Sequence, residues 1–237
     1  MLNLSEAGRK APGTGAYDTR ETQMQDQINV AHRRGFFGRI AAFSTLGLFG
    51  LGATPANAQP AAGDGPNWPG QLKGRHKQVF DVYGINDGFP LGFTNNFLTP
   101  NGDSATAVLI FRHQGTPYAL NHSIWAKYKV GETFKIIDPE TKMPAVKNPW
   151  FQPKQGVIAN PEATLDRIAA RGAVMGVCGV ALRGQSRRLA ENANVTPDEA
   201  YKEFAANLIT KEMTILPSGT WGVNRAQEAG CSYCAGG

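Results

Sequence analysis

The sequence contains few residues of the kinds that build disulfide scaffolds or nucleic-acid surfaces. Only three cysteines and four histidines occur among 237 residues, and an odd cysteine count cannot form a purely structural disulfide framework. At least one thiol is therefore expected to be free or bound to another group. Lysine and arginine total 24 against 19 aspartate and glutamate residues, with no basic run interleaved with aromatic residues. This charge pattern argues against nucleic acid as a partner.

The sequence also lacks an apolar run long enough to span a bilayer comfortably. The uncharged stretch from Ile40 to Thr54 is shorter and richer in glycine than a spanning helix of about 20 residues. Arg33-Arg34 precedes it, and the small-x-small sequence Ala56-Asn57-Ala58 follows it. This layout is typical of a cleavable twin-arginine signal peptide. We predict that residues 1–58 are the signal, with cleavage before Gln59 and a periplasmic mature protein.

The N-terminal segment allows two alternatives. Translation could start at Met1 or at Met24, since nothing before Met24 is needed for targeting. The apolar stretch could instead anchor the chain, but no stop-transfer charges follow it, so we expect no stable membrane span after cleavage. The mature chain then keeps 18 basic and 15 acidic residues, a net charge of +3. Three arginines in one segment are expected to form a solvated helix face: Arg183, Arg187 and Arg188.

The remaining chain predicts one α/β domain over residues 76–237, after a flexible linker over 59–75 that is rich in Pro, Gly and Ala. Strand-like apolar segments occur at 76–84, 105–113, 173–178, 213–216 and 230–234. Helical patterns separate them at 89–98, 117–129, 161–172, 180–191, 197–209 and 218–227. Parallel strands need crossover connections, so we predict an open, mainly parallel sheet of about five strands with helices on both faces.

Local signals refine this organisation. The proline-rich segment 136–160 predicts an irregular insertion. Asn160 and Pro161 resemble a helix start, Thr196 with Glu199 forms a capping-box pattern, and Ser218 precedes another helix. Helical spacing favours core packing for three aromatic residues: Trp125, Tyr128 and Phe134.

Functional groups of an open parallel sheet gather beyond the carboxyl ends of its strands. Cys178 is the sharpest candidate there, because a helix is predicted to begin directly after it and a helix N-terminus favours the thiolate. Gly179 would leave room for an approaching sulfur. Equally, Cys178 could be a small buried residue that ends a strand. Other strand ends supply further candidates: Arg112, His113, Ser218 and Trp221.

The sequence Cys231-Ser-Tyr-Cys234 has the spacing of a dithiol redox motif. No histidine follows Cys234, which disfavours covalent haem attachment. A tetrahedral zinc site would have to recruit Cys178 and His113 as its third and fourth ligands. Both C-terminal cysteines are expected at the same sheet edge as Cys178, with Cys234 the nearer. The other two candidates, His122 and His76, are expected to be surface or packing residues.

Two segments resemble a known family. V-M-G-V-C-G-V-A-L-R, from Val174, and I-L-P-S-G-T-W-G-V-N-R-A-Q-E-A-G-C-S-Y, from Ile215, are similar to the DsrE/DsrF-like sulfur-relay family. The resemblance covers essentially residues 76–234 and implies a DsrE-like fold, homo-oligomers and a persulfide carried on Cys178. The export signal, the proline-rich insertion and the C-terminal C-x-x-C depart from the ordinary family pattern and suggest an exported subgroup.

The sequence thus leads to one main functional hypothesis and two alternatives. In the first, Cys178 accepts and transfers sulfane sulfur as a periplasmic carrier or sulfurtransferase, and Cys231 and Cys234 resolve or receive it. No cofactor is needed, and the partner is a donor or acceptor protein or a small sulfane-sulfur compound. The alternatives are a non-catalytic metal- or haem-binding protein that uses Cys178, His113 and the C-terminal cysteines, or a structural subunit of an oligomer.

Overall fold

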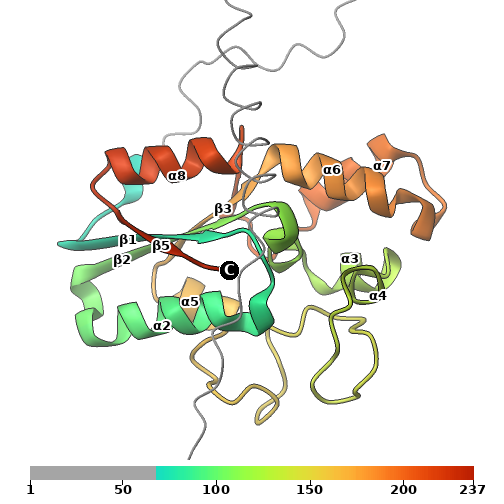
Figure 1. Cartoon of the computed structure of the whole chain (residues 1–237), viewed down its shortest axis with the longest axis horizontal. Helices are drawn as coiled ribbons and strands as arrows, with labels where there is room; N and C mark the ends of the chain where they lie inside the picture. The colour runs from blue at the N-terminus through green and yellow to red at the C-terminus, as the bar shows by residue number, and fades with distance from the viewer. Residues whose placement is uncertain (1–67) are drawn as a thin grey trace, which may run out of the picture. The chain divides into compact units, whose positions relative to one another are not determined.

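A computed structural model describes residues 68–237, which form an α/β fold around one sheet (Figure 1). The predicted signal peptide and most of the predicted linker lie outside these residues. All neighbouring strands are parallel, and their order is β4-β3-β2-β1-β5. The prediction of an open parallel sheet is confirmed. The five strands are β1 (His76–Val82), β2 (Ala105–Phe111), β3 (Val174–Cys178), β4 (Thr214–Leu216) and β5 (Ser232–Ala235).

Helices cover both faces of this sheet, with α8 on one side and α2 and α5 on the other (Figure 1). The α-helices are α2 (Phe89–Asn101), α3 (His122–Lys127), α4 (Val130–Phe134), α5 (Leu165–Ala170), α6 (Gly179–Leu189), α7 (Pro197–Ala206) and α8 (Gly219–Glu228). Short 3₁₀ helices are η1 (Pro69–Gln71), η2 (Asn86–Gly88), η3 (Gly102–Ser104), η4 (His113–Ala119) and η5 (Ala190–Ala193). No helix within residues 68–237 is long and apolar enough to cross a membrane.

The direction of the connections decides which face each helix covers. From β1 to β4 the chain advances steadily across the sheet, and from β4 it returns past all the other strands to β5. Crossovers between parallel strands are right-handed in nearly all proteins, so reversing the direction moves the connecting helix to the other face. This accounts for α8 lying opposite α2 and α5.

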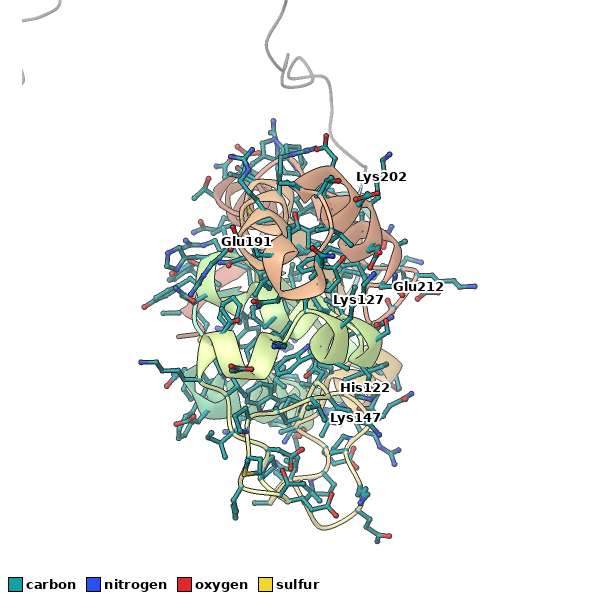
Figure 2. All side chains as sticks on the ribbon, turned by 90° about the vertical axis from the view of Figure 1, so that its right-hand side faces the viewer. His122, Lys127, Lys147, Glu191, Lys202 and Glu212 are labelled. Carbon is teal, nitrogen blue, oxygen red and sulfur yellow. The ribbon has the colours of Figure 1, made fainter. Side chains whose placement is uncertain are left out.

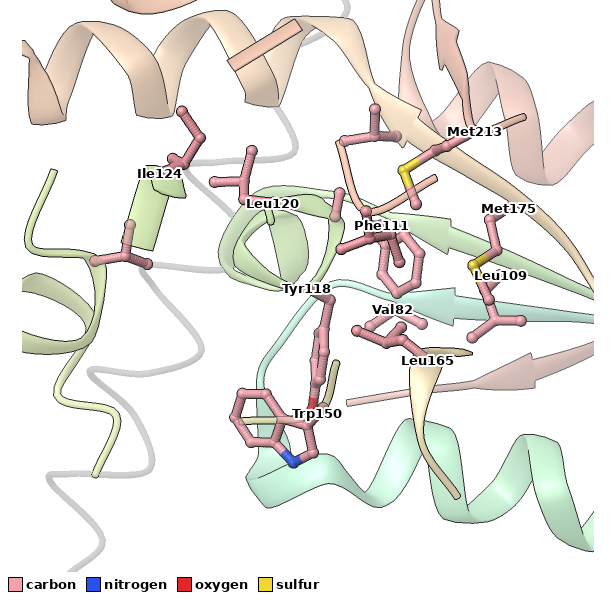
Figure 3. Packing of buried hydrophobic residues seen from close by; sticks show 14 of the residues in the cluster. Val82, Leu109, Phe111, Tyr118, Leu120, Ile124, Trp150, Leu165, Met175 and Met213 are labelled. Atoms are coloured by element: carbon pink, nitrogen blue, oxygen red, sulfur yellow. The ribbon is translucent and has the colours of Figure 1, made fainter. Parts of the chain in front are cut away.

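Two apolar clusters hold the layers together. The larger core, on the α2 side, includes Phe80, Phe111 and Tyr118, and Figure 3 shows the Trp150 ring against Tyr118, with centroids 4.6 Å apart. The smaller core, on the α8 side, includes Ile110. Burying each such large side chain contributes roughly 1.5–3 kcal/mol. Because β2 is central, its residues from 106 to 111 are buried on both faces.

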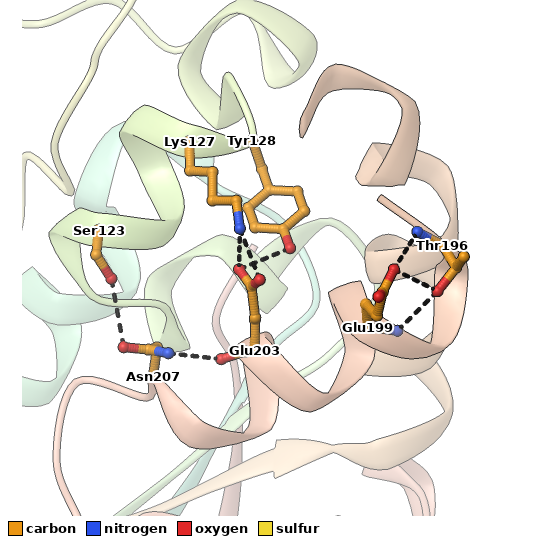
Figure 4. A network of polar contacts seen from close by, with 7 residues as sticks. All are labelled: Ser123, Lys127, Tyr128, Thr196, Glu199, Glu203 and Asn207. Atoms are coloured by element: carbon orange, nitrogen blue, oxygen red, sulfur yellow. Dashed lines mark hydrogen bonds and ion pairs between the residues drawn. The ribbon is translucent and has the colours of Figure 1, made fainter. Parts of the chain in front are cut away.

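Helix α7 begins as its sequence predicts, and polar contacts dock it on the neighbouring helix (Figure 4). Thr196 and Glu199 form a reciprocal capping box, which satisfies backbone amides of the first turn. On the same helix, Glu203 accepts hydrogen bonds from Lys127 at 2.6 Å and from the Tyr128 hydroxyl at 2.8 Å. These contacts join α7 to α3. Core packing is confirmed for Trp125 and Tyr128, both fully buried, and Phe134 packs partly buried at the core edge.

Two segments differ from the prediction. The folded part begins earlier than residue 76, because Trp68 and Leu72 are buried in the smaller core. Residues 117–129 do not form one helix: the chain turns through η4, and α3 starts only after Asn121, whose side chain accepts from the Ser123 amide. Local capping therefore overrides the apolar periodicity.

The predicted helix at 161–172 also starts later than expected. The Asn160 side chain accepts from the Glu162 amide at 3.1 Å, which closes a turn instead of opening a helix. Helix α5 then covers only Leu165–Ala170, and Gly172 follows it at φ 79°, as expected after a helix end. Segment 136–160 contains no named helix or strand, which agrees with its predicted irregularity.

Candidate functional site

An open cleft of about 330 Å³ lies beyond the carboxyl ends of β2, β3 and β4. The chain leaves β3 into α6, whose Leu182 belongs to the larger core, and leaves β4 into α8, whose Ala226 belongs to the smaller core. The two connections therefore diverge between neighbouring strands. A crevice at such a switch point is the usual ligand site of open α/β sheets. Its walls are formed by Arg112, His113, Cys178, Val180, Ala181, Gly184, Gln185, Ser218, Gly219 and Thr220.

Cys178 is the N-cap residue of the 11-residue helix α6. Its Sγ accepts a hydrogen bond from the Ala181 amide, with 3.3 Å between sulfur and nitrogen. Only 6% of the residue is exposed, yet it lines the cleft. The residue is thus buried at a strand end, as one interpretation of the sequence requires, and it also lines a cleft, as the other requires. Backbone amides at a helix N-terminus stabilise negative charge next to them.

A second feature of the cleft is an ion pair at the end of β2. Arg112 binds the buried carboxylate of Asp81 through two parallel bonds, Nε to Oδ1 at 2.6 Å and the terminal nitrogen Nη2 to Oδ2 at 2.7 Å. The Tyr233 hydroxyl donates to the same Oδ2 at 3.1 Å. The hydrogen bond to Asp81 raises the pKa of Arg112 despite the opposing effect of burial. The Arg112 guanidinium also lies over the Tyr83 ring, 5.3 Å from its centroid.

The remaining candidates at the cleft differ in role. The side chain of Ser218 caps α8 by accepting from the Trp221 amide at 3.1 Å, as the sequence predicts. His113 is exposed on the cleft wall, and its carbonyl accepts from the Gln185 side chain. Trp221 does not line the cleft and packs instead against the smaller core.

Gly179 serves the fold and not substrate access. A Cβ at this position would lie 2.7 Å from the Leu216 carbonyl oxygen, so only glycine lets α6 start this close to β4. A Cβ at Gly219 would similarly meet the Arg112 side chain at 2.6 Å. The glycines therefore keep the walls of the cleft close together.

The C-terminal cysteines do not lie where the sequence predicts. Cys231 precedes β5 and is buried in the smaller core, whereas Cys234 lies in mid-strand and packs against the larger core. The two side chains are on opposite faces of the sheet, because residues three apart in a strand point in opposite directions. All three cysteines are free. An extended spacing of three residues, about 10 Å, exceeds the Cα separation of a disulfide.

The strand register also separates Cys234 from Cys178. Cys234 pairs with Phe80, which aligns through β2 with Met175, three residues before Cys178. Three strand spacings of about 4.8 Å and a rise of about 10 Å place the two Cα atoms roughly 17 Å apart. A direct exchange of sulfur within one chain therefore does not fit this structure, which corrects the expected role of Cys234.

The same placement removes the four-ligand metal site considered from the sequence. Cys178 and His113 line the cleft, whereas Cys231 and Cys234 lie on different faces of the far edge. Within residues 68–237, no group of three or more His, Cys, Asp and Glu side chains could hold a metal ion. These four residues could not supply a tetrahedral site without rearrangement.

A second cleft of about 280 Å³ lies in the insertion, away from the sheet edge. His122 lines it, with its ring 5.4 Å from the Phe151 ring and its Nδ1 accepting from the Asn148 amide. Figure 2 shows His122 beside Lys147. Burial, with a smaller effect of Lys147, lowers the pKa of His122. This histidine is a packing residue, as predicted, and His76 is exposed at the start of β1.

Sequence reasoning missed Asp81 and the role of Tyr233. A signal was present, because Asp81 lies between Phe80 and Val82 in the apolar half of its strand, and a carboxylate buried in a sheet needs a partner. The identity of that partner depends on the register of three strands, which the sequence pattern does not specify.

Comparison with known proteins identifies no relative of this chain. No family model matches the chain, and no curated protein or solved structure matches it significantly.

Proposed function

We propose that this protein carries sulfane sulfur as a persulfide on Cys178. One observation supports this most directly: the only cysteine on the cleft wall caps α6 and accepts an amide hydrogen bond on its sulfur. This contact is suited to a thiolate, which is the nucleophilic form of cysteine. Cys231 and Cys234 have no comparable setting, since burial raises the pKa of both thiols.

The resemblance to the DsrE/DsrF-like sulfur-relay family supports the same assignment. It implies a cysteine at the end of a central strand, followed by glycine and a helix, and Cys178 with Gly179 has this arrangement between β3 and α6. The resemblance also implies a parallel α/β sheet, and the fold agrees. Fold agreement alone does not assign a function, so the proposal depends on the position of the cysteine.

The proposed reaction is a thiol–persulfide exchange. The Cys178 thiolate attacks the outer sulfur of a donor persulfide, R–S–SH. A new S–S bond forms on Cys178 while the donor S–S bond breaks, so the products are Cys178–S–SH and the thiolate R–S⁻. No external oxidant is required. Because Cys234 lies far from Cys178, the acceptor of this sulfur is another molecule.

A loading experiment tests the proposal. The mature chain and a Cys178→Ser variant are incubated with polysulfide, and the intact mass is measured. We expect a gain of about 32 Da per added sulfur in the wild type and no gain in the variant, because the hydroxyl is a far weaker nucleophile. The variants Cys231→Ser and Cys234→Ser serve as matched controls and should load normally. Undiminished loading of Cys178→Ser would refute the assignment.

We further propose that the protein works in the periplasm after twin-arginine export. Arg33 and Arg34 lie outside the described residues, so the proposal depends on sequence alone. A variant with both Arg33→Lys and Arg34→Lys should accumulate as precursor in the cytoplasm, because the paired arginines are the signal that the export machinery reads. Cell fractionation and N-terminal sequencing measure this. Normal export of the double variant, or cleavage elsewhere than before Gln59, would contradict it.

A further inference from the structure

The Arg112 guanidinium has an unused edge. Arginine carries five N–H donors in a planar fork, and Asp81 occupies the edge formed by Nε and Nη2. Within residues 68–237, the structure gives the other three donors no hydrogen-bond partner. The edge formed by the two terminal nitrogens presents two nearly parallel N–H groups, which match a pair of oxygens on one anion.

This arginine is held rigidly at the cleft. Its carboxylate partner Asp81 is 5% exposed while Arg112 itself is 28% exposed, so one edge is fixed in the interior and the side chain still reaches solvent. Tyr233 fixes the carboxylate from the last strand, and the Arg112 stem packs on Gly219. A guanidinium that is already ordered loses little entropy when it binds a ligand.

Two features of the cleft bear on the charge of a ligand. Among the described residues that line it, none is an aspartate or a glutamate, and Arg112 is its one permanently charged side chain. The 10-residue helix α8 also begins there, and its N-terminus adds partial positive charge. A cleft of about 330 Å³ lies within the size range of sites that take small molecules.

We propose that the cleft selects small sulfur donors that carry a carboxylate or sulfonate, and that the unused edge of Arg112 binds this oxyanion. This inference rests on the proposed function, since it places the donor's sulfur at Cys178 and its anionic end at Arg112, both on one cleft wall. The bound pair of oxygens then orients the donor for the exchange reaction. Arg112 is therefore a binding residue that determines donor specificity.

The first test needs no variant. The persulfides of 3-mercaptopropionate and of 3-mercaptopropionamide differ only in the anionic group, and loading of wild-type Cys178 is followed by mass spectrometry at low donor concentration. We expect the carboxylate donor to load roughly tenfold faster or more, the typical gain from a charge-assisted bond. Equal rates for the two donors would overturn the inference and leave the proposed function intact.

A double variant assigns the preference to Arg112. Arg112→Gln alone would leave the buried Asp81 carboxylate without its cationic partner and could unfold the protein. Combining it with Asp81→Asn removes both charges and leaves the net charge unchanged. This double variant should load the two donors at equal rates. Arg187→Gln with Asp198→Asn removes an equivalent pair of exposed charges and should keep the tenfold preference. A preference that survives in the Arg112 double variant would overturn the assignment.

A binding measurement separates the two proposals. Propionate alone should slow alkylation of Cys178 by iodoacetamide in the wild type, because it occupies the cleft without reacting. Propionamide at the same concentration should not protect. If neither donor loads Cys178 while propionate still protects it, the proposed function fails and the oxyanion site stands. If propionate gives no protection, the oxyanion site is refuted whatever the loading result.

Discussion

Two regions of this sheet, the carboxyl end of β3 and the far edge at β5, hold cysteines in contrasting settings. At the carboxyl end of β3, Cys178 lines a cleft and receives an amide hydrogen bond at the start of a helix. At the far edge, Cys231 precedes β5 and Cys234 lies within it; they pack on opposite faces and receive no such bond on sulfur within the described residues. The chemistry available to a thiol here depends on its position relative to the strand end.

The comparison also explains why the C-x-x-C spacing misleads. In a helix, residues three apart lie on the same face, which brings two thiols together at the start of redox-active helices. In β5 the same spacing sends the side chains to opposite faces. The motif is therefore informative only together with the secondary structure that contains it.

One side chain connects the two regions, and its removal should lower the free energy of unfolding more than any other substitution considered below. Asp81 accepts from Arg112 at the cleft and from Tyr233 in β5. Asp81→Ala would leave a partly buried guanidinium unpaired, and we expect a loss of about 3 kcal/mol in the free energy of unfolding. Urea denaturation measures this.

The exposed Asp103 provides the matched control for this substitution. Asp103→Ala should change the free energy of unfolding by less than about 0.5 kcal/mol. If Asp81→Ala changes it equally little, the ion pair does not hold the two regions together.

Alkylation kinetics should sharpen the contrast between the cysteines. In the native protein at neutral pH, iodoacetamide should modify Cys178 at least roughly tenfold faster than Cys231 or Cys234, because the thiolate is the reactive form and burial raises the pKa of the two C-terminal thiols. Timed quenching and peptide mass spectrometry give all three rates from one sample. Fastest modification of Cys234, which is more exposed than the other two cysteines, would assign the reactive region to the far edge.

The types of element and the parallel sheet could be predicted where the sequence carries local signals, but the order of the strands could not. The apolar run in β2 and the capping box at Thr196 identify their elements directly, and both are confirmed. Residues 117–129 were not assigned correctly, because local capping by Asn121 interrupts the apolar pattern and the path of the chain before it depends on tertiary contacts such as the bond from Asn148 to the Tyr118 carbonyl.

The candidate site was only partly predictable for a similar reason. Four residues meet because each ends or follows a strand of the same parallel sheet, and that rule needs no register: Cys178, Arg112, His113 and Ser218. The contacts of Asp81 depend on β1 lying between β2 and β5. Nothing local in the sequence specifies that the last strand joins the edge beside β1, so Tyr233 and the true position of Cys234 could not be derived.

The smallest predicted effect concerns pH and again separates the two regions. Burial raises the pKa of Cys231 above its usual value of about 9, so the folded state keeps this proton after the unfolded state has lost it. The resulting stabilisation is complete below that value and is lost as the pH rises through the higher folded pKa.

A Cys231→Val variant lacks this titration, and its free energy of unfolding should fall less steeply between about pH 8 and about pH 10 than that of the wild type. Urea denaturation under reducing conditions compares the two slopes, with the exposed Ser232→Ala variant as a control that should follow the wild type. Parallel curves for Cys231→Val and wild type would show that Cys231 ionises as freely in the folded state as in the unfolded state, and would contradict the assigned effect of burial on its thiol.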